Sequence, residues 1–221
     1  MIGTLNEGAL HAQLKQWYRM PGDLLEQKVD GYVIDLLRGD LLVEFQTGGF
    51  APLRKKLAVL AEDHPVRLVA PVALTRRIVR LSADGEILSC RRSPKRGCLH
   101  DVFDRLVSIP ALVSHPNFEV EVLLTHQDEL RMFRPGRAYR RRGWAVEERV
   151  LVSVEQSVLI AGAADAARLL PELDATFDTA ELAVASCIDR RLAQRMAYCL
   201  RALDVIAPVG KRGGAVLYAR V

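Results

Sequence analysis

Residues 33–46 read VIDLLRGDLLVEFQ, and this stretch decides the fold that we expect for the surrounding chain. Two runs rich in Val, Ile and Leu, Tyr32–Leu37 and Leu41–Gln46, stand on either side of Arg38-Gly39-Asp40. Strand-forming runs separated by a short glycine-containing turn are typical of a hairpin. The segment therefore predicts two antiparallel strands joined by a tight turn.

Three polar side chains interrupt this apolar hairpin. Asp35 lies on the first strand, whereas Glu44 and Gln46 lie two positions apart on the second strand and face the same side. Two carboxylates held side by side repel each other unless a cation lies between them, and oxygen ligands suit Mg²⁺ or Mn²⁺. Asp30 is a rival to Asp35, but the neighbouring Gly31 indicates a turn, so Asp35 is the preferred ligand.

The alternative is that Asp35 is a polar residue at a strand edge and that Glu44 lies on the surface. However, residues 41–43 and Phe45 make the second strand apolar on both faces. An unpaired Glu buried in such a strand would be strongly destabilising. The pattern therefore favours a metal site over a pair of surface residues.

The segments around the hairpin alternate between helical and strand-like patterns. In the first of them Leu10, Leu14 and Trp17 form one apolar stripe, and Asn6 is the expected helix cap. We expect a helix at 6–20, a short strand at 27–31, a helix at 50–63 and a buried strand at 66–72. Further on we expect strands at 77–81 and 86–90, a helix at 99–107, and strands at 118–124 and 144–154.

The sequence also contains two basic segments that we expect to be loops. Ser93–Gly97 is either a phosphate-binding loop or a solvated hairpin end. Arg134–Gly143 is rich in Arg, and together with Tyr139 and Trp144 it could grip a nucleic-acid backbone and stack on bases. A plain solvated basic turn is the alternative for this loop.

An Asp on one strand, then Glu-x-Gln at the end of the next, then a helix with basic residues and a buried strand, is similar to the PD-(D/E)xK nuclease superfamily. The resemblance is to the variant in which Gln replaces the motif lysine, and it covers residues 5–72 in the order αβββαβ. It implies a restriction-endonuclease-like fold, an α/β class in which a mixed sheet core is flanked by helices. We assign this domain to residues 1–160.

The same resemblance implies roles for individual residues. Asp35 and Glu44 would ligate Mg²⁺ or Mn²⁺, and Gln46 stands where the lysine usually stands and would hold a water. A glutamate on the first helix often completes such a site, and Glu7 is the carboxylate available there. Thr47-Gly48-Gly49 also agrees with the residues that often follow the motif.

The C-terminal segment resembles a winged helix-turn-helix domain, which we place at residues 165–221. Two helices and a strand hairpin are expected at 179–185, 189–203, 206–209 and 215–218. In such a domain the second helix enters the major groove and the wing contacts phosphates. The basic residues in these two places are the candidate nucleic-acid contacts: Arg190, Arg191, Arg195, Lys211 and Arg212. Because acidic residues nearly balance them, a protein-contact domain is the alternative.

Composition narrows the class of protein. Half of the residues are hydrophobic and 26% are charged, which is typical of a globular chain, and the net charge of +4 only weakly favours an anionic partner. No apolar run reaches the ~18 residues of a membrane span, and no signal peptide is recognisable, so we expect a cytoplasmic protein. The four cysteines form no CxxC pair, and the five histidines show no metal-binding spacing.

Together these patterns predict a Mg²⁺-dependent hydrolase that cleaves phosphodiester bonds in DNA, with DNA bound mainly by the winged helix. A catalytically inactive nuclease fold that serves as a DNA-binding adaptor or regulator is the first alternative. A module whose two domains both bind protein is the second. The sequence does not distinguish a monomer from a homodimer, or DNA from RNA.

Overall fold

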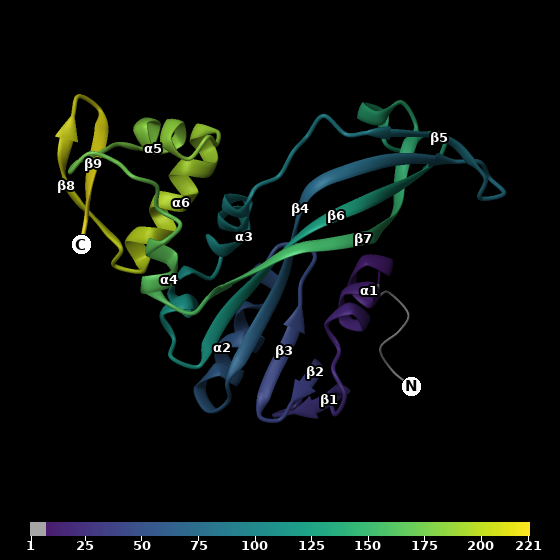
Figure 1. Ribbon diagram of the computed structural model, residues 1–221, viewed down its shortest axis with the longest axis horizontal. Helices are drawn as coiled ribbons and strands as arrows, with labels where there is room; N and C mark the ends of the chain where they lie inside the picture. The colour runs from purple at the N-terminus through teal and green to yellow at the C-terminus, as the bar shows by residue number, and fades with distance from the viewer. Residues whose placement is uncertain (1–7) are drawn as a thin grey trace.

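The computed structural model describes residues 8–221 and has an α/β fold with a mixed sheet flanked by helices (Figure 1). The main sheet has seven strands in the order β1-β2-β3-β4-β6-β7, with β5 paired to β4. Strands β3, β4 and β6 are parallel to one another, and the remaining neighbours are antiparallel. The strands are β1 (Leu24–Val29), β2 (Tyr32–Arg38), β3 (Leu41–Phe45), β4 (Val66–Leu81), β5 (Ile87–Arg92), β6 (Phe118–Phe133) and β7 (Trp144–Ile160).

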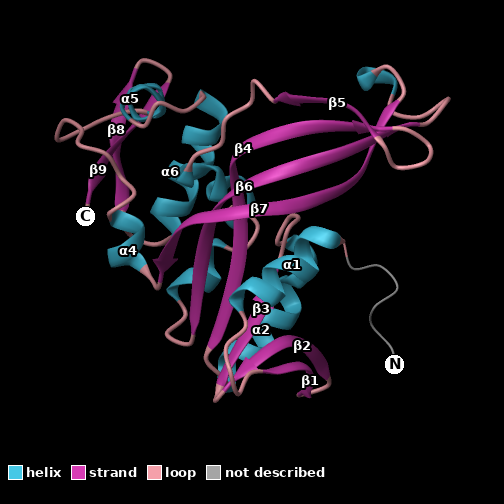
Figure 2. Cartoon of the chain, turned by 45° about the vertical axis from the view of Figure 1, so that its right-hand side comes forward, coloured by secondary structure: helices cyan, strands magenta, loops and turns pink. Residues whose placement is uncertain are grey.

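Helices cover the two faces of the sheet unequally (Figure 2). One apolar cluster joins α1 to one face, and a larger cluster on the other face joins α2, α3 and the C-terminal helices. The α-helices are α1 (Ala9–Tyr18), α2 (Arg54–Asp63), α3 (Phe103–Leu106), α4 (Ala163–Ala167), α5 (Thr179–Ala185) and α6 (Arg190–Ala202). The 3₁₀ turns are η1 (Ala51–Leu53), η2 (Leu99–Val102), η3 (Pro110–Ser114) and η4 (Tyr139–Arg141).

Helix α1 packs through a face that differs slightly from the predicted one. Leu10 and Leu14 are buried as expected, but Trp17 is 50% exposed and Tyr18 is buried in its place. Residues three or four apart lie on the same face of a helix, so either Trp17 or Tyr18 can follow Leu10 and Leu14 in the buried stripe. Tyr18 takes the buried position because its hydroxyl forms hydrogen bonds with Glu121 and Arg67 on the sheet.

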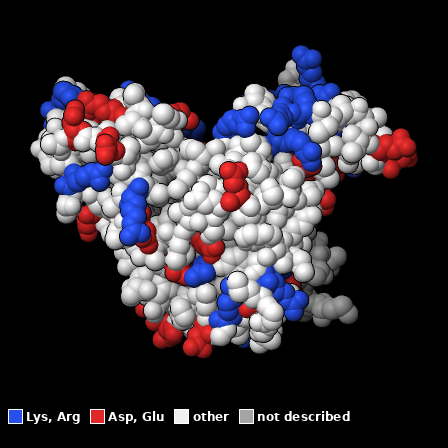
Figure 3. Space-filling view, in the orientation of Figure 1, with Lys and Arg blue, Asp and Glu red and all other residues white. Residues whose placement is uncertain are grey.

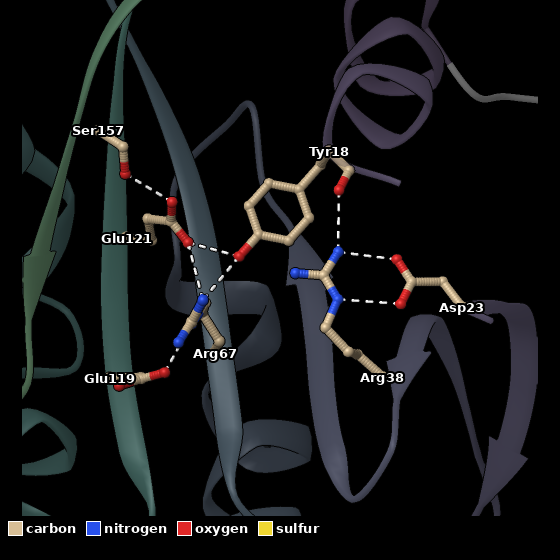
Figure 4. A network of polar contacts seen from close by, with 7 residues as sticks. All are labelled: Tyr18, Asp23, Arg38, Arg67, Glu119, Glu121 and Ser157. Atoms are coloured by element: carbon tan, nitrogen blue, oxygen red, sulfur yellow. Dashed lines mark hydrogen bonds and ion pairs between the residues drawn. The ribbon is translucent and has the colours of Figure 1, made fainter. Parts of the chain in front are cut away.

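A buried polar network anchors the end of α1 to the sheet (Figure 4). Tyr18 donates a hydrogen bond to Glu121 on β6 at 2.5 Å, and Arg67 on β4 donates to the Tyr18 hydroxyl at 2.8 Å. Ser157 on β7 donates to the other oxygen of Glu121 at 2.5 Å, and Arg67 also pairs with Glu119. Burial and the bond to Glu121 raise the pKa of Tyr18 to about 12, so this phenol remains a hydrogen-bond donor.

A second ion pair ties α1 to the hairpin. Arg38 at the end of β2 donates to both carboxylate oxygens of Asp23, at 2.9 and 2.7 Å, and also to the main-chain oxygen of Tyr18 at 2.9 Å. Because Asp23 is almost completely buried, this bidentate contact fixes α1 against the β2–β3 turn. The network and this pair together hold the whole of α1, including His11, over the hairpin.

The long strands correct the predicted strand lengths. The predicted strands at 66–72 and 77–81 are one continuous strand, β4, and β6 and β7 likewise extend beyond 118–124 and 144–154. Pro71 and the charged residues that follow it interrupt the apolar pattern. The strand continues nevertheless, because β4 pairs with β6 from Val66 to Leu81. Cross-strand pairing here overrides the local sequence pattern.

One edge of β4 has a gap between its strand partners. On this edge β3 pairs with Val66–Val69, and β5 pairs with Arg77–Leu81. Residues 70–76 lie between these two partners. Pro71 lacks an N–H group, so its place in a gap of the ladder has little cost.

The C-terminal segment contains the predicted helices and hairpin. Asp178 caps α5 in a capping box with Glu181, and strands β8 (Ile206–Arg212) and β9 (Ala215–Arg220) pair antiparallel. The turn is at Gly213-Gly214, so residues 210–212 belong to β8 and not, as expected, to a loop. Apolar residues of α5 and α6 join the core beneath α2 and α3 in one continuous cluster.

None of the helices in residues 8–221 has the length and apolar character required to cross a membrane.

Candidate functional site

The β2–β3 ladder opens at the two predicted carboxylates. Leu36 and Val43 are paired, and the next positions along the strands are Asp35 and Glu44. At these positions carboxylates, not main-chain oxygens, accept the hydrogen bonds of the backbone. Phe45 N–H donates to Asp35 Oδ2 at 2.9 Å, and Asp35 N–H donates to Glu44 Oε1 at 3.3 Å. On its other edge β3 stays paired with β4 through Glu44 and Phe45, so only the β2 side of the strand is open here. The two acidic residues thus flank one short stretch of backbone.

Glu44 is buried and forms an ion pair with α2. Its side chain lies opposite the face on which Val43 and Phe45 contact α1, and Lys56 Nζ lies 2.5 Å from Glu44 Oε1. The same ammonium donates to the main-chain oxygen of Val33 at 2.5 Å. Burial and repulsion from Asp35 raise the pKa of Glu44, and the ammonium only partly offsets this rise.

Asp35 is less buried and faces α1. His11 Nε2 lies 3.2 Å from Asp35 Oδ2 and 2.9 Å from the main-chain oxygen of Phe45. Because both neighbours are acceptors, this nitrogen carries the hydrogen. Burial opposes ionisation of Asp35, but the contacts with His11 and Phe45 N–H outweigh it and lower the pKa. The environments therefore move the pKa values of the two carboxyls in opposite directions.

Each carboxylate keeps one oxygen without a partner. Within residues 8–221, the hydrogen bonds engage Asp35 Oδ2 and Glu44 Oε1, and none engages Asp35 Oδ1 or Glu44 Oε2. No cluster of three or more His, Cys, Asp or Glu with metal-binding geometry is found in this part of the chain. Asp35 is held from the α1 side and Glu44 from the α2 side, so a single ion would have to lie between carboxylates that are held from opposite faces of the sheet. Mg²⁺ is usually bound by one or two carboxylates and completes its coordination with water and phosphate oxygens.

The other predicted members of the site lie elsewhere. Gln46 donates from Nε2 to the main-chain oxygen of Gly49 at 2.9 Å, so its amide supports the following loop. Asp30, the rival ligand, pairs with His64 at the β1–β2 turn. Glu7 and the predicted cap Asn6 lie outside the described residues, and the residue at the N-cap position of α1 is Gly8.

The basic residues of α6 divide into two groups. Arg190 and Arg191, in the first turn of the helix, are exposed. Arg195, one turn later, forms an ion pair with Asp104 on α3. The predicted contact at Arg195 is therefore already engaged in holding α6 to the core, whereas the two preceding arginines face solvent.

The hairpin β8–β9 carries the remaining predicted contacts. Lys211 and Arg212 are both exposed. Arg212 pairs with Glu181 at 2.6 Å and with Asp178 at 3.3 Å, both at the start of α5. These two acidic residues compete with a phosphate for Arg212, whereas Lys211 forms no ion pair within residues 8–221.

The far ends of β4–β7 form an arm rich in Lys and Arg, and a notch separates the arm from the C-terminal helices (Figure 3). Tyr139, in the basic loop at its tip, is 97% exposed. Trp144 is engaged within the arm, since its ring meets Phe133 edge-on and lies under the guanidinium of Arg80. Tyr139 therefore remains available for stacking, and Trp144 supports the arm.

Sequence reasoning missed Lys56 and His11. Lys56 lies three residues after Leu53 and four before the buried Leu60, so its position on the inner face of α2 follows from helical spacing. His11 directly follows the buried Leu10, at the edge of the α1 stripe. In both cases the helical pattern was visible, but contact with the hairpin depended on how the helices pack.

The arrangement defines a class of α/β protein in which a mixed sheet opens at two adjacent carboxylates, each contacted by a basic residue from a different helix. Residues 8–161 match the family described as domain of unknown function DUF8091, and the chain belongs to this family. It is similar to an uncharacterized protein of Treponema pallidum (strain Nichols), with 29% identity over 223 residues, 99% of this chain and 87% of that protein. No solved structure matches the chain.

Proposed function

We propose that this protein is a divalent-metal-dependent nuclease that hydrolyses phosphodiester bonds in DNA on a core like that of the PD-(D/E)xK superfamily. The order α1-β1-β2-β3-α2-β4 supports this proposal, because it is the αβββαβ order that the resemblance implies. The parallel pairing of β3 with β4, and the positions of α1 and α2 on opposite faces, also support it.

The observation that carries the proposal is the opening of the ladder at Asp35 and Glu44. Both carboxylates are withdrawn from bulk water, yet within residues 8–221 each retains an oxygen without a hydrogen-bond donor. The lowered pKa of Asp35 keeps this group ionised at neutral pH. Asp35 Oδ1 and Glu44 Oε2 would hold Mg²⁺ or Mn²⁺, which would lower the pKa of a bound water and polarise the scissile phosphate.

Lys56 and His11 are positioning residues in this proposal. The Lys56 ammonium holds the Glu44 carboxylate from the α2 side, and His11 holds Asp35 from the α1 side. Lys56 also provides a positive charge near the reacting phosphate, which the uncharged Gln46 does not provide. Two helices thus preorganise the carboxylates before substrate binds.

The C-terminal segment is proposed to be a winged helix that contributes to DNA binding. The order α5-α6-β8-β9 supports this, and a single bridge between Phe177 and Tyr218 adds a third short strand to the hairpin. Arg190 and Arg191 lie at the N-terminal end of α6, the end that enters the major groove in helix-turn-helix proteins. Their exposure leaves them free to contact DNA.

A second candidate function is a DNA-binding adaptor on an inactive core. The ion pair between Lys56 and Glu44 favours it, because the pair compensates the buried carboxylate without a metal. The contact of Gln46 with Gly49 favours it as well, since the amide is turned to the loop.

The test of the proposal is a cleavage assay on the full chain with Mg²⁺ or Mn²⁺. Double-stranded DNA, single-stranded DNA and RNA are offered in parallel. Cleavage that is lost in Asp35→Asn and Glu44→Gln, and kept in Asp30→Asn, supports the nuclease. Metal-independent DNA binding without any cleavage, equal in all four proteins, overturns it in favour of the adaptor.

A further inference from the structure

The gap on the edge of β4 between residues 70 and 76 opens into a cavity of about 220 Å³. The cavity lies between β4, helix α3 and the Ser93–Gly97 loop. Thr47 lines it on the side of the carboxylate site, and Arg105 Nη1 contacts the main-chain oxygen of Gln46 at 3.3 Å. The cavity therefore begins directly after the Glu-x-Gln segment.

The Ser93–Gly97 loop is fastened to β4 by its backbone. Ser93 N–H donates to the main-chain oxygen of Arg76 at 2.8 Å, and Gly97 N–H donates to that of Leu74 at 3.2 Å. A side chain at position 97 would collide with the main-chain oxygen of Ala73. Only glycine allows this close approach, so the loop is held as one wall of the cavity.

Arg76 has a buried N–H group that forms no hydrogen bond within residues 8–221. Its Nε atom is buried and has no hydrogen-bond partner, and within residues 8–221 its guanidinium forms no ion pair. Burial lowers the pKa of Arg76 and the nearby charge of Arg149 lowers it further, although the charges of Glu129 and Asp101 act in the opposite direction. Buried donor atoms in folded proteins are normally hydrogen-bonded. The missing partner of Arg76 is therefore expected to come from outside the chain.

Two more cations surround the cavity without a carboxylate partner. Arg105 donates only to the main-chain oxygens of Pro71 and Gln46 and lies over the ring of Phe50, and burial lowers its pKa to about 10. Lys95 lines the cavity from the loop and, within residues 8–221, forms no ion pair. Three cations thus line one polar cavity.

The two acidic residues at the cavity are already engaged. Asp101 Oδ2 accepts from Cys98 N–H at the start of η2, at 3.4 Å, and completes a capping box there. Asp104 pairs with Arg195 on α6. Neither carboxylate forms an ion pair with the three cations, and their charges only partly offset the positive charge, because three cations line the cavity beside two carboxylates.

We propose that this cavity, formed by Arg76, Lys95 and Arg105, is a binding site for a phosphate group. A phosphate has several acceptor oxygens, so it can satisfy the Arg76 guanidinium and take further donors from Lys95 and Arg105. The cavity adjoins the carboxylate site, and the phosphate is therefore assigned to the nucleic-acid backbone next to the bond that would be cleaved. This assignment of the source rests on the proposed function, but phosphate binding itself does not.

The test uses the full chain in EDTA, so that no result depends on metal or cleavage. Inorganic phosphate is titrated at constant ionic strength while the melting temperature is followed, and affinity for a fluorescent DNA oligonucleotide is measured by anisotropy. The variants are Arg76→Gln and Lys95→Ala. Arg77→Gln is the matched control, because Arg77 is the next residue on β4 but is exposed and paired with Asp128.

We expect phosphate to raise the melting temperature of the wild type and of Arg77→Gln, but not of Arg76→Gln. We also expect Arg76→Gln to weaken oligonucleotide binding by about tenfold, as loss of a buried charged hydrogen bond does. Weaker oligonucleotide binding in Arg76→Gln without a phosphate effect still supports a backbone site. Stabilisation by free phosphate with unchanged oligonucleotide affinity overturns the backbone assignment, and no difference between Arg76→Gln and Arg77→Gln overturns the site.

Discussion

Two charged sites lie side by side where β3 ends, and the protein balances their charges differently. At the carboxylate site the buried Glu44 meets Lys56, and Asp35 meets His11. At the neighbouring cavity the buried Nε of Arg76 has no hydrogen-bond partner in the part of the chain that the structure describes. Within residues 8–221, the carboxylates of the first site each contact a basic side chain, whereas the three cations of the second form no ion pair.

This difference indicates what each site needs from outside. A compensated carboxylate is stable without a ligand, so a metal there has to compete with Lys56 for Glu44. A partly buried guanidinium whose Nε has no partner within residues 8–221 would gain a hydrogen bond from an anion, which favours a ligand role. The second site therefore argues more directly for a bound phosphate than the first does for a bound metal.

The largest effect that we expect is on cleavage. Asp35→Asn or Glu44→Gln should lower the rate of metal-dependent cleavage on the order of a hundredfold to a thousandfold, since each removes a charge that holds the metal. The measurement is a time course on plasmid DNA with Mg²⁺ and with Mn²⁺. Asp30→Asn, at the β1–β2 turn, should cleave at the wild-type rate. Equal rates in all four proteins would remove Asp35 and Glu44 from the mechanism.

The next effect is on stability at the carboxylate site. Lys56→Met leaves Glu44 buried without its cation and should lower the free energy of unfolding by about 3 kcal/mol, as breaking a buried pair does. Chemical denaturation in EDTA measures this change. Lys55→Met, on the exposed side of α2, is the matched control and should leave stability unchanged. If both variants behave alike, the ion pair contributes nothing to the fold.

The pH dependence of stability follows from the pKa of Glu44. Burial and repulsion from Asp35 raise this pKa in the folded state, so the folded protein holds the proton more tightly than the unfolded chain. Stability is then lost as pH rises from the unfolded value of about 4.3 through the raised pKa. Relative to wild type, metal-free Glu44→Gln should therefore gain more stability at pH 8 than at pH 4. A pH-independent difference between the two proteins would contradict the raised pKa.

Loss of a charge at the cavity should not lower the free energy of unfolding, in contrast to Lys56→Met at the carboxylate site. Arg76→Gln removes a partly buried cation whose Nε has no partner within residues 8–221, so the free energy of unfolding without phosphate should stay equal or rise, by about 1 kcal/mol at most. Denaturation of Arg76→Gln beside Lys56→Met compares the two sites directly. A loss in Arg76→Gln as large as that in Lys56→Met would mean that Arg76 is a structural residue.

The smallest effect concerns the proposed wing. Lys211→Ala should weaken DNA binding and reduce the slope of log affinity against log salt by about one unit, as loss of one phosphate contact does. The melting temperature should not change, because the side chain is exposed. Arg212→Ala should change the slope less, since Arg212 is already paired with Glu181 and Asp178. Unchanged binding in both variants would favour a protein-contact role for this segment.

Much of the fold around the hairpin could be predicted because it is encoded locally. The turn at Arg38-Gly39-Asp40, the apolar runs beside it and the leucine spacing of α2 each specify their own element. The adjacency of Asp35 and Glu44 follows from the turn alone. The single strand β4 could not be predicted, because Pro71 interrupts its pattern and only pairing with the distant β6 keeps it continuous.

The rest of the site depends on packing between distant segments. Lys56 reaches Glu44 because α2 lies on one particular face of the sheet. The cavity forms because α3 and the Ser93–Gly97 loop pack beside the gap between β3 and β5 on the edge of β4 and serve as its walls. The side chain of Gln46 donates a hydrogen bond to the main-chain oxygen of Gly49, a local contact that spacing along a strand does not reveal.

The most direct test of the metal site is a crystal structure of the full chain soaked in Mn²⁺, with anomalous scattering used to locate the ion. The account predicts a peak within about 2.1–2.2 Å of one oxygen of Asp35 and one oxygen of Glu44. It also predicts that the same soak of Glu44→Gln shows no peak there. A wild-type crystal without a peak at these oxygens, in which Lys56 still holds Glu44, would contradict the nuclease and leave the inactive adaptor.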